Sequence, residues 1–329
     1  MKFGLIGFGI FALLLISFSI WFYVMRLSGP ALMELNDFHP FRSAQAKTEF
    51  LAYEKELARA WPVVSEEKTV QTSFGSTFMR VSGPSDAPPL VLLPGGGSTS
   101  LIWKANIGAL SSVYRTYALD NIYDVGQSVI TREIKSGADF SAWLDELFDS
   151  LGLGNNIRIV GYSYGGWVSA QYALFHPERL ARVVLIAPAG TVLPISGGML
   201  LRMVLSLVPH KYFVRRVMYW TWDDLVKSGS AGKKITDERV DFVMLAYGSF
   251  KFKAGVNPSA LSDQEIAGFN VPVLYIVGEH EKVYDGRAAI ARLKELAPKI
   301  ETELIPETGH DLLFTHTETV NKRVMKFIE

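Results

Sequence analysis

Residues 157–166 read Ile-Arg-Ile-Val-Gly-Tyr-Ser-Tyr-Gly-Gly, near the middle of a chain of 329 residues. The first four are typical of a buried strand, and the apolar residues at 167–175 predict a helix. Between them stands Gly-x-Ser-x-Gly, with Ser163 at its centre. Glycines permit a sharp turn from strand to helix, which exposes the serine hydroxyl where the partial positive charge of the helix favours a developing anion. This placement predicts a nucleophile rather than an ordinary Gly-Ser turn.

Short apolar runs alternate with longer helical patterns on both sides of this motif. A hairpin is expected at 68–73 and 77–81, around a Phe-Gly-Ser turn. Strands that alternate with helices predict an α/β fold with a mostly parallel sheet and helices on both faces. The buried strands are expected at 90–93, 116–119, 157–160, 183–186 and 273–277. The helices between them are expected at 140–151, 167–175 and 287–296.

The chain divides into four expected parts. Residues 1–27 are expected to form a transmembrane anchor, and residues 28–62 a linker with an amphipathic helix at 44–61 that Pro62 ends. Residues 63–190 and 263–329 are expected to form the α/β core. Residues 191–262 show no buried strand, and we expect them to form a helical cap over the carboxyl edge of the sheet, where ligands bind in open α/β sheets.

The anchor is predicted from an uncharged run at 3–25, bounded by Lys2 and Arg26. As a helix this run is about 34 Å long, enough for a hydrocarbon core of about 30 Å. The alternative is a cleaved signal peptide, but the apolar run is long and no A-x-A-like cleavage site follows it. We therefore expect a single-pass membrane protein. Lys2 and Arg26 balance each other and leave its side open, with a slight preference for an exported body.

The composition excludes several classes of protein. Apolar residues make up 49% of the chain, which is ample for a core and excludes a disordered protein. Lys and Arg balance Asp and Glu at 33 each, so the basic excess of nucleic-acid-binding proteins is absent. There is no cysteine, and the six histidines form no HExxH, so neither a metal nor an organic cofactor is expected. The composition leaves the oligomeric state open.

Four motifs together resemble the α/β-hydrolase superfamily, specifically its cap-bearing serine hydrolases. The resemblance covers roughly residues 69–329. Besides the turn at Ser163, it rests on the Leu-Leu-Pro-Gly-Gly-Gly run at 92–97, Asp120 followed by Gly-Gln-Ser at 126–128, and Thr-Gly-His at 308–310. The resemblance implies a catalytic triad in the chain order nucleophile, acid, base.

The resemblance places the base after the last strand and the acid three residues after the glycine that ends the strand before it. His310 and Glu281 stand at these positions, in the order Ser163, Glu281, His310. Asp285 is a rival acid, but it immediately precedes an expected helix and suits an N-cap. His316 is a weaker candidate base, which we expect to face solvent or to help cap a helix. The other position used by some relatives, at 187–190, holds no carboxylate.

An oxyanion hole needs two N–H donors. The first expected donor is the backbone of Tyr164, directly after the nucleophile. The second is expected from Gly96, which matches the family by its position in the loop, because Pro94 stands where relatives often have histidine. The alternative for the triple glycine is a flexible turn.

These residues predict a serine hydrolase that acts on a small apolar ester, as a carboxylesterase or lipase-like enzyme. The same constellation serves thioesterases, C–C bond hydrolases, aminopeptidases and cofactor-free peroxidases, so these remain alternatives. A non-catalytic binding protein on the same fold is a further alternative. Apolar cap residues could line the substrate pocket, pack on the core or, at 199–208, contact the bilayer. They are Leu200, Leu201, Met203, Val204, Trp220 and Trp222.

Overall fold

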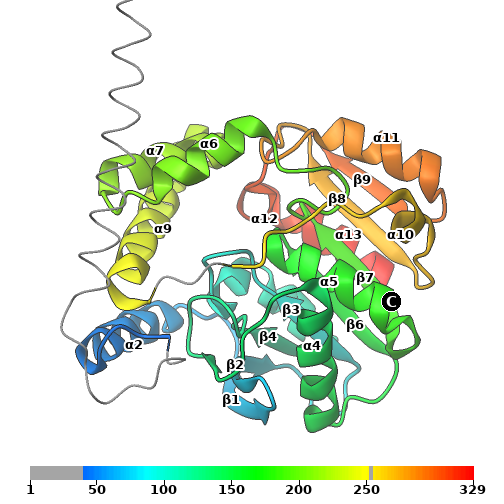
Figure 1. The fold of residues 1–329 in the computed structure, drawn as a ribbon, viewed down its shortest axis with the longest axis horizontal. Coiled ribbons are helices and arrows are strands. Elements are labelled where there is room, and N and C mark those ends of the chain that lie inside the picture. Colours follow the sequence, from blue (N-terminus) through cyan, green and yellow to red (C-terminus); the bar gives the residue numbers. More distant parts are fainter. Residues whose placement is uncertain (1–39, 252–254) are drawn as a thin grey trace, which may run out of the picture. The chain divides into compact units, whose positions relative to one another are not determined.

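The computed structural model describes residues 40–251 and 255–329. Nine strands in this part of the chain form one sheet, shown in Figure 1. Their order is β1-β2-β4-β3-β6-β7-β8-β9, with β5 paired to β2, and only the pairings of β2 and its neighbours are antiparallel. The expected α/β architecture is therefore confirmed. The strands are β1 Ser65–Thr72, β2 Gly75–Ser82, β3 Pro89–Leu93, β4 Arg115–Leu119, β5 Val129–Ile130, β6 Ile157–Tyr162, β7 Leu180–Ile186, β8 Val273–Gly278 and β9 Glu301–Ile305.

Helices cover both faces of the sheet because successive side chains of each parallel strand point to opposite sides. In β3, Val91 and Leu93 face one core and Leu90 and Leu92 face the other. The first core is covered by α4 Gly137–Leu151, α5 Tyr164–Phe175, α10 Asp263–Ala267 and α11 Gly286–Leu296. The second core is covered by the 3₁₀ helix Ser100–Ala105, α3 Ile107–Ser111, α12 Leu312–Thr315 and α13 Thr317–Ile328.

Local sequence signals set the ends of these helices. The Ser136 hydroxyl accepts the N–H of Asp139 and caps the start of α4. Gly152 ends α4 with φ at 67°, a left-handed conformation that glycine adopts without strain. The same helix turns Trp143 and Phe148 into the core, so its position on the sheet follows from its apolar face.

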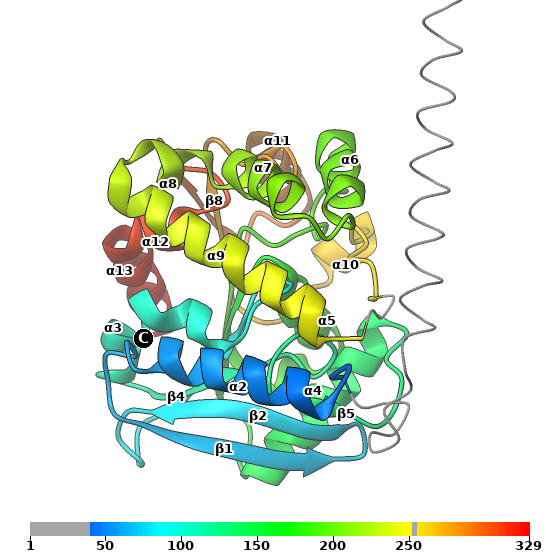
Figure 2. The same ribbon diagram turned by 90° about the vertical axis from the view of Figure 1, so that its left-hand side faces the viewer.

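A second group of helices lies between β7 and β8. It consists of α6 Gly197–Ser206, α7 Lys211–Thr221, α8 Asp223–Lys227 and α9 Ser230–Ser249. In Figures 1 and 2, α6 and α7 lie at the end of the described unit opposite β1, and α9 runs from there to α2. The boundaries of the predicted cap remain a prediction.

The helix α2, Ala44–Ala58, precedes the sheet and packs along α9. The rings of Phe50 and Phe242 lie 5.8 Å apart in this contact. The expected helix at 44–61 is therefore three residues too long. From Arg59 to Trp61, each N–H bonds to the carbonyl three residues back, so the chain leaves the helix through a tighter turn before Pro62.

No helix within the described residues is both long enough and apolar enough to cross a membrane. The expected anchor at 1–27 lies outside these residues.

One carboxylate of α2 is fully buried against the sheet. Glu54 has no exposed surface, and a nitrogen of Arg80 on β2 lies 4.0 Å from its carboxylate. Burial, with a further contribution from the negative charge of Asp120, raises the pKa of Glu54 to about 8. In the unfolded chain this group ionises near 4.5. Between these two values the folded state therefore holds a proton that the unfolded state has released, and folding stability falls as the pH rises.

We expect Glu54→Gln to remove this dependence on pH. The variant should match the wild type near pH 5 and exceed it near pH 8 by up to a few kcal/mol, at about 1.4 kcal/mol for each unit of pKa shift. Chemical unfolding of the purified protein over this pH range measures the difference. Glu56→Gln, on the exposed side of the same helix, is the matched control. Parallel pH curves for the wild type and Glu54→Gln would contradict the prediction.

Candidate active site

Ser163 lies between β6 and α5 in a backbone conformation that side chains rarely adopt, with φ at 52°. Two glycines make this turn sterically possible. A Cβ at Gly161 would lie 2.2 Å from the carbonyl oxygen of Gly165, and one at Gly165 would lie 2.4 Å from the carbonyl oxygen of Leu93. The turn is thus pressed against both its own helix and the end of β3, and it holds Ser163 at the carboxyl edge of the sheet.

His310 follows β9 and reaches Ser163 from a neighbouring loop. Its Nε2 lies 2.9 Å from the Ser163 Oγ, within hydrogen-bond distance. The Tyr162 hydroxyl donates to the backbone carbonyl of His310 at 2.6 Å. The strand that carries the serine therefore also fixes the loop that carries the histidine.

Glu281 follows β8 and lies on the other side of the imidazole. Its Oε2 is 2.9 Å from the His310 Nδ1, while its Oε1 accepts the N–H groups of Lys282 and Val283 at 2.9 and 2.8 Å. The Glu281 side chain is fully buried. Asp285 instead accepts the N–H of Ala288 at the start of α11, in the N-cap position considered for it. The structure thus brings Glu281, and not Asp285, to His310.

Two opposing effects act on the imidazole. Burial lowers the pKa of His310, but the charge and hydrogen bond of Glu281 raise it, and the net shift is upward. The Glu281 carboxylate therefore stabilises the protonated imidazole, which forms when His310 accepts a proton as the general base.

The Gly-Gly-Gly loop at 95–97 lies directly beside the serine turn. A Cβ at Gly95 would lie 3.3 Å from the Ser163 Cβ, and one at Gly96 would lie 3.5 Å from the Tyr164 Cβ. The two residues expected to supply oxyanion donors, Gly96 and Tyr164, are therefore neighbours in space.

Two charged residues that the sequence analysis missed hold this loop. Asp124 accepts the N–H of Gly97 at 2.7 Å, and Arg239 of α9 donates to the Gly97 carbonyl at 2.7 Å. Burial raises the pKa of Asp124 to about 6 and lowers that of Arg239 to about 10. A helix inserted between β7 and β8 thus helps to position the expected oxyanion loop.

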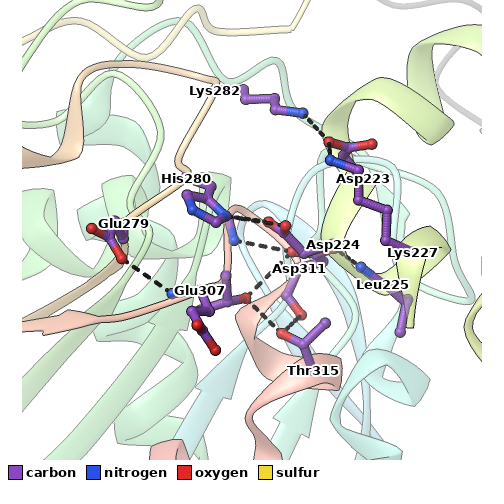
Figure 3. Close-up of polar contacts among 12 residues, drawn as sticks. Asp223, Asp224, Leu225, Lys227, Glu279, His280, Lys282, Glu307, Asp311 and Thr315 are labelled. Carbon is purple, nitrogen blue, oxygen red and sulfur yellow. Dashed lines mark hydrogen bonds and ion pairs between the residues drawn. The ribbon is translucent and has the colours of Figure 1, made fainter.

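Polar contacts also join α8 to the loops that carry Glu281 and His310, as Figure 3 shows. Asp224 lies 3.1 Å from the imidazole of His280, and Asp223 lies 3.0 Å from the Lys282 ammonium. These two partners flank Glu281 in the chain. Asp311, next to His310, accepts the N–H of Leu225 at 2.6 Å.

The other histidines within the described residues are not part of this constellation. His316 lies between α12 and α13 and contacts the Thr315 hydroxyl, without the side-chain cap that had been considered for it. His176 ends α5, and His210 caps α7. His39 lies outside the described residues. Among the residues that the structure describes, no group of three or more His, Asp or Glu side chains could hold a metal ion.

A cavity of about 230 Å³ begins at Ser98 and Thr99, immediately after the glycine loop. Trp222, Phe242 and Arg239 also line it, and no triad candidate borders it. Of the six apolar residues considered for a substrate pocket, only Trp222 lines this cavity. Leu200, Leu201, Met203 and Val204 are exposed and do not line this cavity.

Comparison with known proteins identifies the family. A family model of the alpha/beta hydrolase fold matches residues 88–317, more than half of the chain. The chain belongs to the α/β-hydrolase family. The resemblance stated from the motifs is confirmed.

Carboxylesterases of Bacillus subtilis are similar to this α/β hydrolase over most of its length. Carboxylesterase YbfK is 35% identical over 285 residues, which cover 85% of this chain and 93% of the relative. Its crystal structure, named carboxylesterase CesB (YbfK), has a TM-score of 0.78 and 31% identity, with coverage of 87% of this chain and 99% of that one. The crystal structure of naproxen esterase (carboxylesterase NP) has a TM-score of 0.78 and 30% identity, with coverage of 90% and 100%.

Proposed function

We propose that this α/β hydrolase is a membrane-anchored serine carboxylesterase with Ser163, His310 and Glu281 as its catalytic triad. The observation that carries the triad is the continuous contact from the Ser163 Oγ through both nitrogens of His310 to the buried carboxylate of Glu281, each step at 2.9 Å. The ester-hydrolysing class is supported by the carboxylesterase relatives, which cover more than four-fifths of the chain.

In this proposal the Ser163 oxygen attacks the acyl carbon of the ester while His310 removes its proton through Nε2. His310 then protonates the leaving alcohol, which departs and leaves the acyl group on Ser163. A water molecule, deprotonated by His310, cleaves the acyl-enzyme and restores the serine. Throughout these steps Glu281 holds the imidazole orientation and stabilises its protonated form.

The negative charge that develops on the carbonyl oxygen would be stabilised by the backbone N–H groups of Gly96 and Tyr164. The contact between the glycine loop and the serine turn supports this assignment. Arg239 and Asp124 act in the proposal as positioning residues, because each contacts the loop through Gly97.

The proposed substrate is a small, largely apolar ester. The cavity beside the glycine loop has apolar surface from Ile102, Trp222, Phe242 and Phe314, but no triad candidate borders it, so the substrate class rests on the relatives. The names of the relatives, carboxylesterase and naproxen esterase, point to this class.

The membrane anchor in the proposal is the uncharged run at 3–25, whose length suffices to span a bilayer. Of the two sides of the membrane, export of the enzyme body is slightly preferred.

Covalent labelling by a fluorophosphonate probe tests the activated serine. We expect the wild-type protein to be labelled, with the adduct on the peptide that contains Ser163, and Ser163→Ala to lose the label. Ser112→Ala, which removes an exposed hydroxyl far along the chain from the turn at Ser163, should be labelled like the wild type. Folded wild-type protein that is not labelled would contradict the proposed triad and favour the non-catalytic binding protein.

A further inference from the structure

The surface of α6 is unusually apolar for a helix at the outside of a protein. The helix has no buried residue, and four of its large apolar side chains are between 40% and 62% exposed. Of the ten large apolar residues exposed in the described part of the chain, six lie between positions 200 and 212. They are Leu200 (49% exposed), Leu201 (62%), Met203 (40%), Val204 (62%), Leu207 (55%) and Tyr212 (57%).

Four of these side chains form a stripe along one helical face. Positions 200, 204 and 207 follow the spacing of a single helical face, and 203 lies beside it. Tyr212, at the start of α7, is a further exposed ring that follows α6 closely in the chain. A contiguous apolar patch of this kind marks an interaction surface more often than scattered exposed residues do. We call this stripe, with the basic residues described next, the α6–α7 face.

The charged residues within this segment of the chain are all basic. Residues 197–222 contain Arg202, Lys211, Arg215 and Arg216 and no aspartate or glutamate. Lys211 and Arg215 pair with Asp241 and Asp237 of α9.

Arg202 and Arg216 have no ion pair with any described residue. Arg202 packs over the ring of Trp220 at 3.8 Å, and Arg216 lies over Tyr212 at 5.9 Å. Their charges are therefore available to an anionic partner beside the apolar stripe.

An apolar helical face with aromatic and basic residues at its margin has the chemistry of a helix that lies in the surface of an anionic bilayer. The proposed anchor supplies the second argument for this occupant. A chain held at the membrane by residues 3–25 carries its α6–α7 face at high local concentration beside lipid. A soluble partner protein has no comparable support in the structure.

We propose that the α6–α7 face docks onto anionic phospholipid, with the stripe from Leu200 to Leu207 among the acyl chains and Arg202 and Arg216 at the headgroups. This inference rests on the membrane anchoring in the proposed function. It gives α6 and α7 a role that the esterase reaction does not require. Docking would hold the helices between β7 and β8 at the interface, where amphiphilic esters concentrate.

The absence of cysteine allows a direct test on the full chain. A single cysteine introduced as Val204→Cys is labelled with an environment-sensitive fluorophore, and the protein is reconstituted into phosphatidylcholine vesicles with or without phosphatidylglycerol. The matched control is Val64→Cys, at an exposed position next to β1, the strand that lies opposite α6 in Figures 1 and 2. We expect the label at 204, and not at 64, to emit at shorter wavelength and to be quenched by lipids that carry a spin label on their acyl chains.

The headgroup contacts are tested in the same labelled background. Arg216→Gln should weaken the docked state about fivefold in vesicles that contain phosphatidylglycerol, because one basic residue near an anionic surface contributes about 1 kcal/mol. The variant should change little in phosphatidylcholine alone.

The outcomes separate this inference from the proposed function. Flotation with vesicles measures anchoring, and ester hydrolysis in detergent measures activity. If the chain floats and hydrolyses esters while the label at 204 stays as exposed to water as the label at 64, docking is wrong and the proposed function stands. A blue shift at 204 without quenching by lipid would mean that protein covers the face, and this also overturns docking. A chain that does not float contradicts both.

Discussion

Ser163→Ala and His310→Ala are each expected to lower kcat/KM for ester hydrolysis by about 10⁴- to 10⁶-fold. Without Ser163 no acyl-enzyme forms, and without His310 the serine hydroxyl keeps its proton. The double variant should be no worse than either single variant, because the two residues act as one unit. Steady-state hydrolysis of a chromogenic ester by detergent-purified protein measures all three.

The control for this prediction is His316→Ala. His316 was the weaker candidate base, and the structure gives it a contact with Thr315 and none with the serine. Its replacement should leave kcat/KM close to that of the wild type. If His310→Ala kept most of its activity while His316→Ala lost it, the base would be His316, and the contact at 2.9 Å between His310 and Ser163 would have no catalytic role.

Ser163, Glu281 and His310 could be predicted from the sequence because each lies just beyond the end of a strand. Ser163 and His310 are 147 positions apart, yet their Oγ and Nε2 atoms are 2.9 Å apart. The carboxyl ends of parallel strands meet at one edge of a sheet, so position after a strand translates into proximity. The family pattern then distinguished Glu281 from Asp285, and the N-cap signal gave Asp285 a different role.

The residues that hold the glycine loop were missed because their positions depend on which distant segments meet. Arg239 is one of several basic residues in α9, and its sequence neighbours do not distinguish it. For Asp124 the sequence holds a partial signal, because this residue lies between Asp120 and Gly126, which carry part of the family resemblance. A Cβ at Gly126 would lie 2.6 Å from the Asp120 carboxylate, which explains why glycine stands there.

The apolar residues of α6 illustrate a second limit. Their helical spacing predicts an apolar face, but the sequence does not say whether that face turns toward a pocket, the core or the outside. In the structure Leu201 and Val204 are both 62% exposed. Helical periodicity defines a stripe, and the packing of α6 against its neighbours decides the direction in which the stripe points.

Glu281→Gln is expected to lower kcat by about 10²- to 10⁴-fold while the protein stays folded. The amide oxygen can still accept the N–H groups of Lys282 and Val283, which now bond to Oε1. The amide nitrogen would then face the His310 Nδ1 as a donor, so the ring proton moves to Nε2, and Nε2 can no longer accept the proton of Ser163. The charge that stabilises the protonated imidazole is lost as well.

The pH profile distinguishes this role from a purely structural one. Burial lowers the pKa of His310, and the wild-type value is raised overall because Glu281 outweighs burial. The neutral imidazole of His310 predominates only above its pKa. The acid limb of the kcat/KM profile therefore follows the pKa of His310. With Glu281 neutralised, the residual activity should have its acid limb at lower pH than the wild type. Asp285→Asn removes a charge but keeps a good N-cap, so both its rate and its acid limb should match the wild type. The reverse pattern, with Asp285→Asn slow and Glu281→Gln unaffected, would make Asp285 the acid.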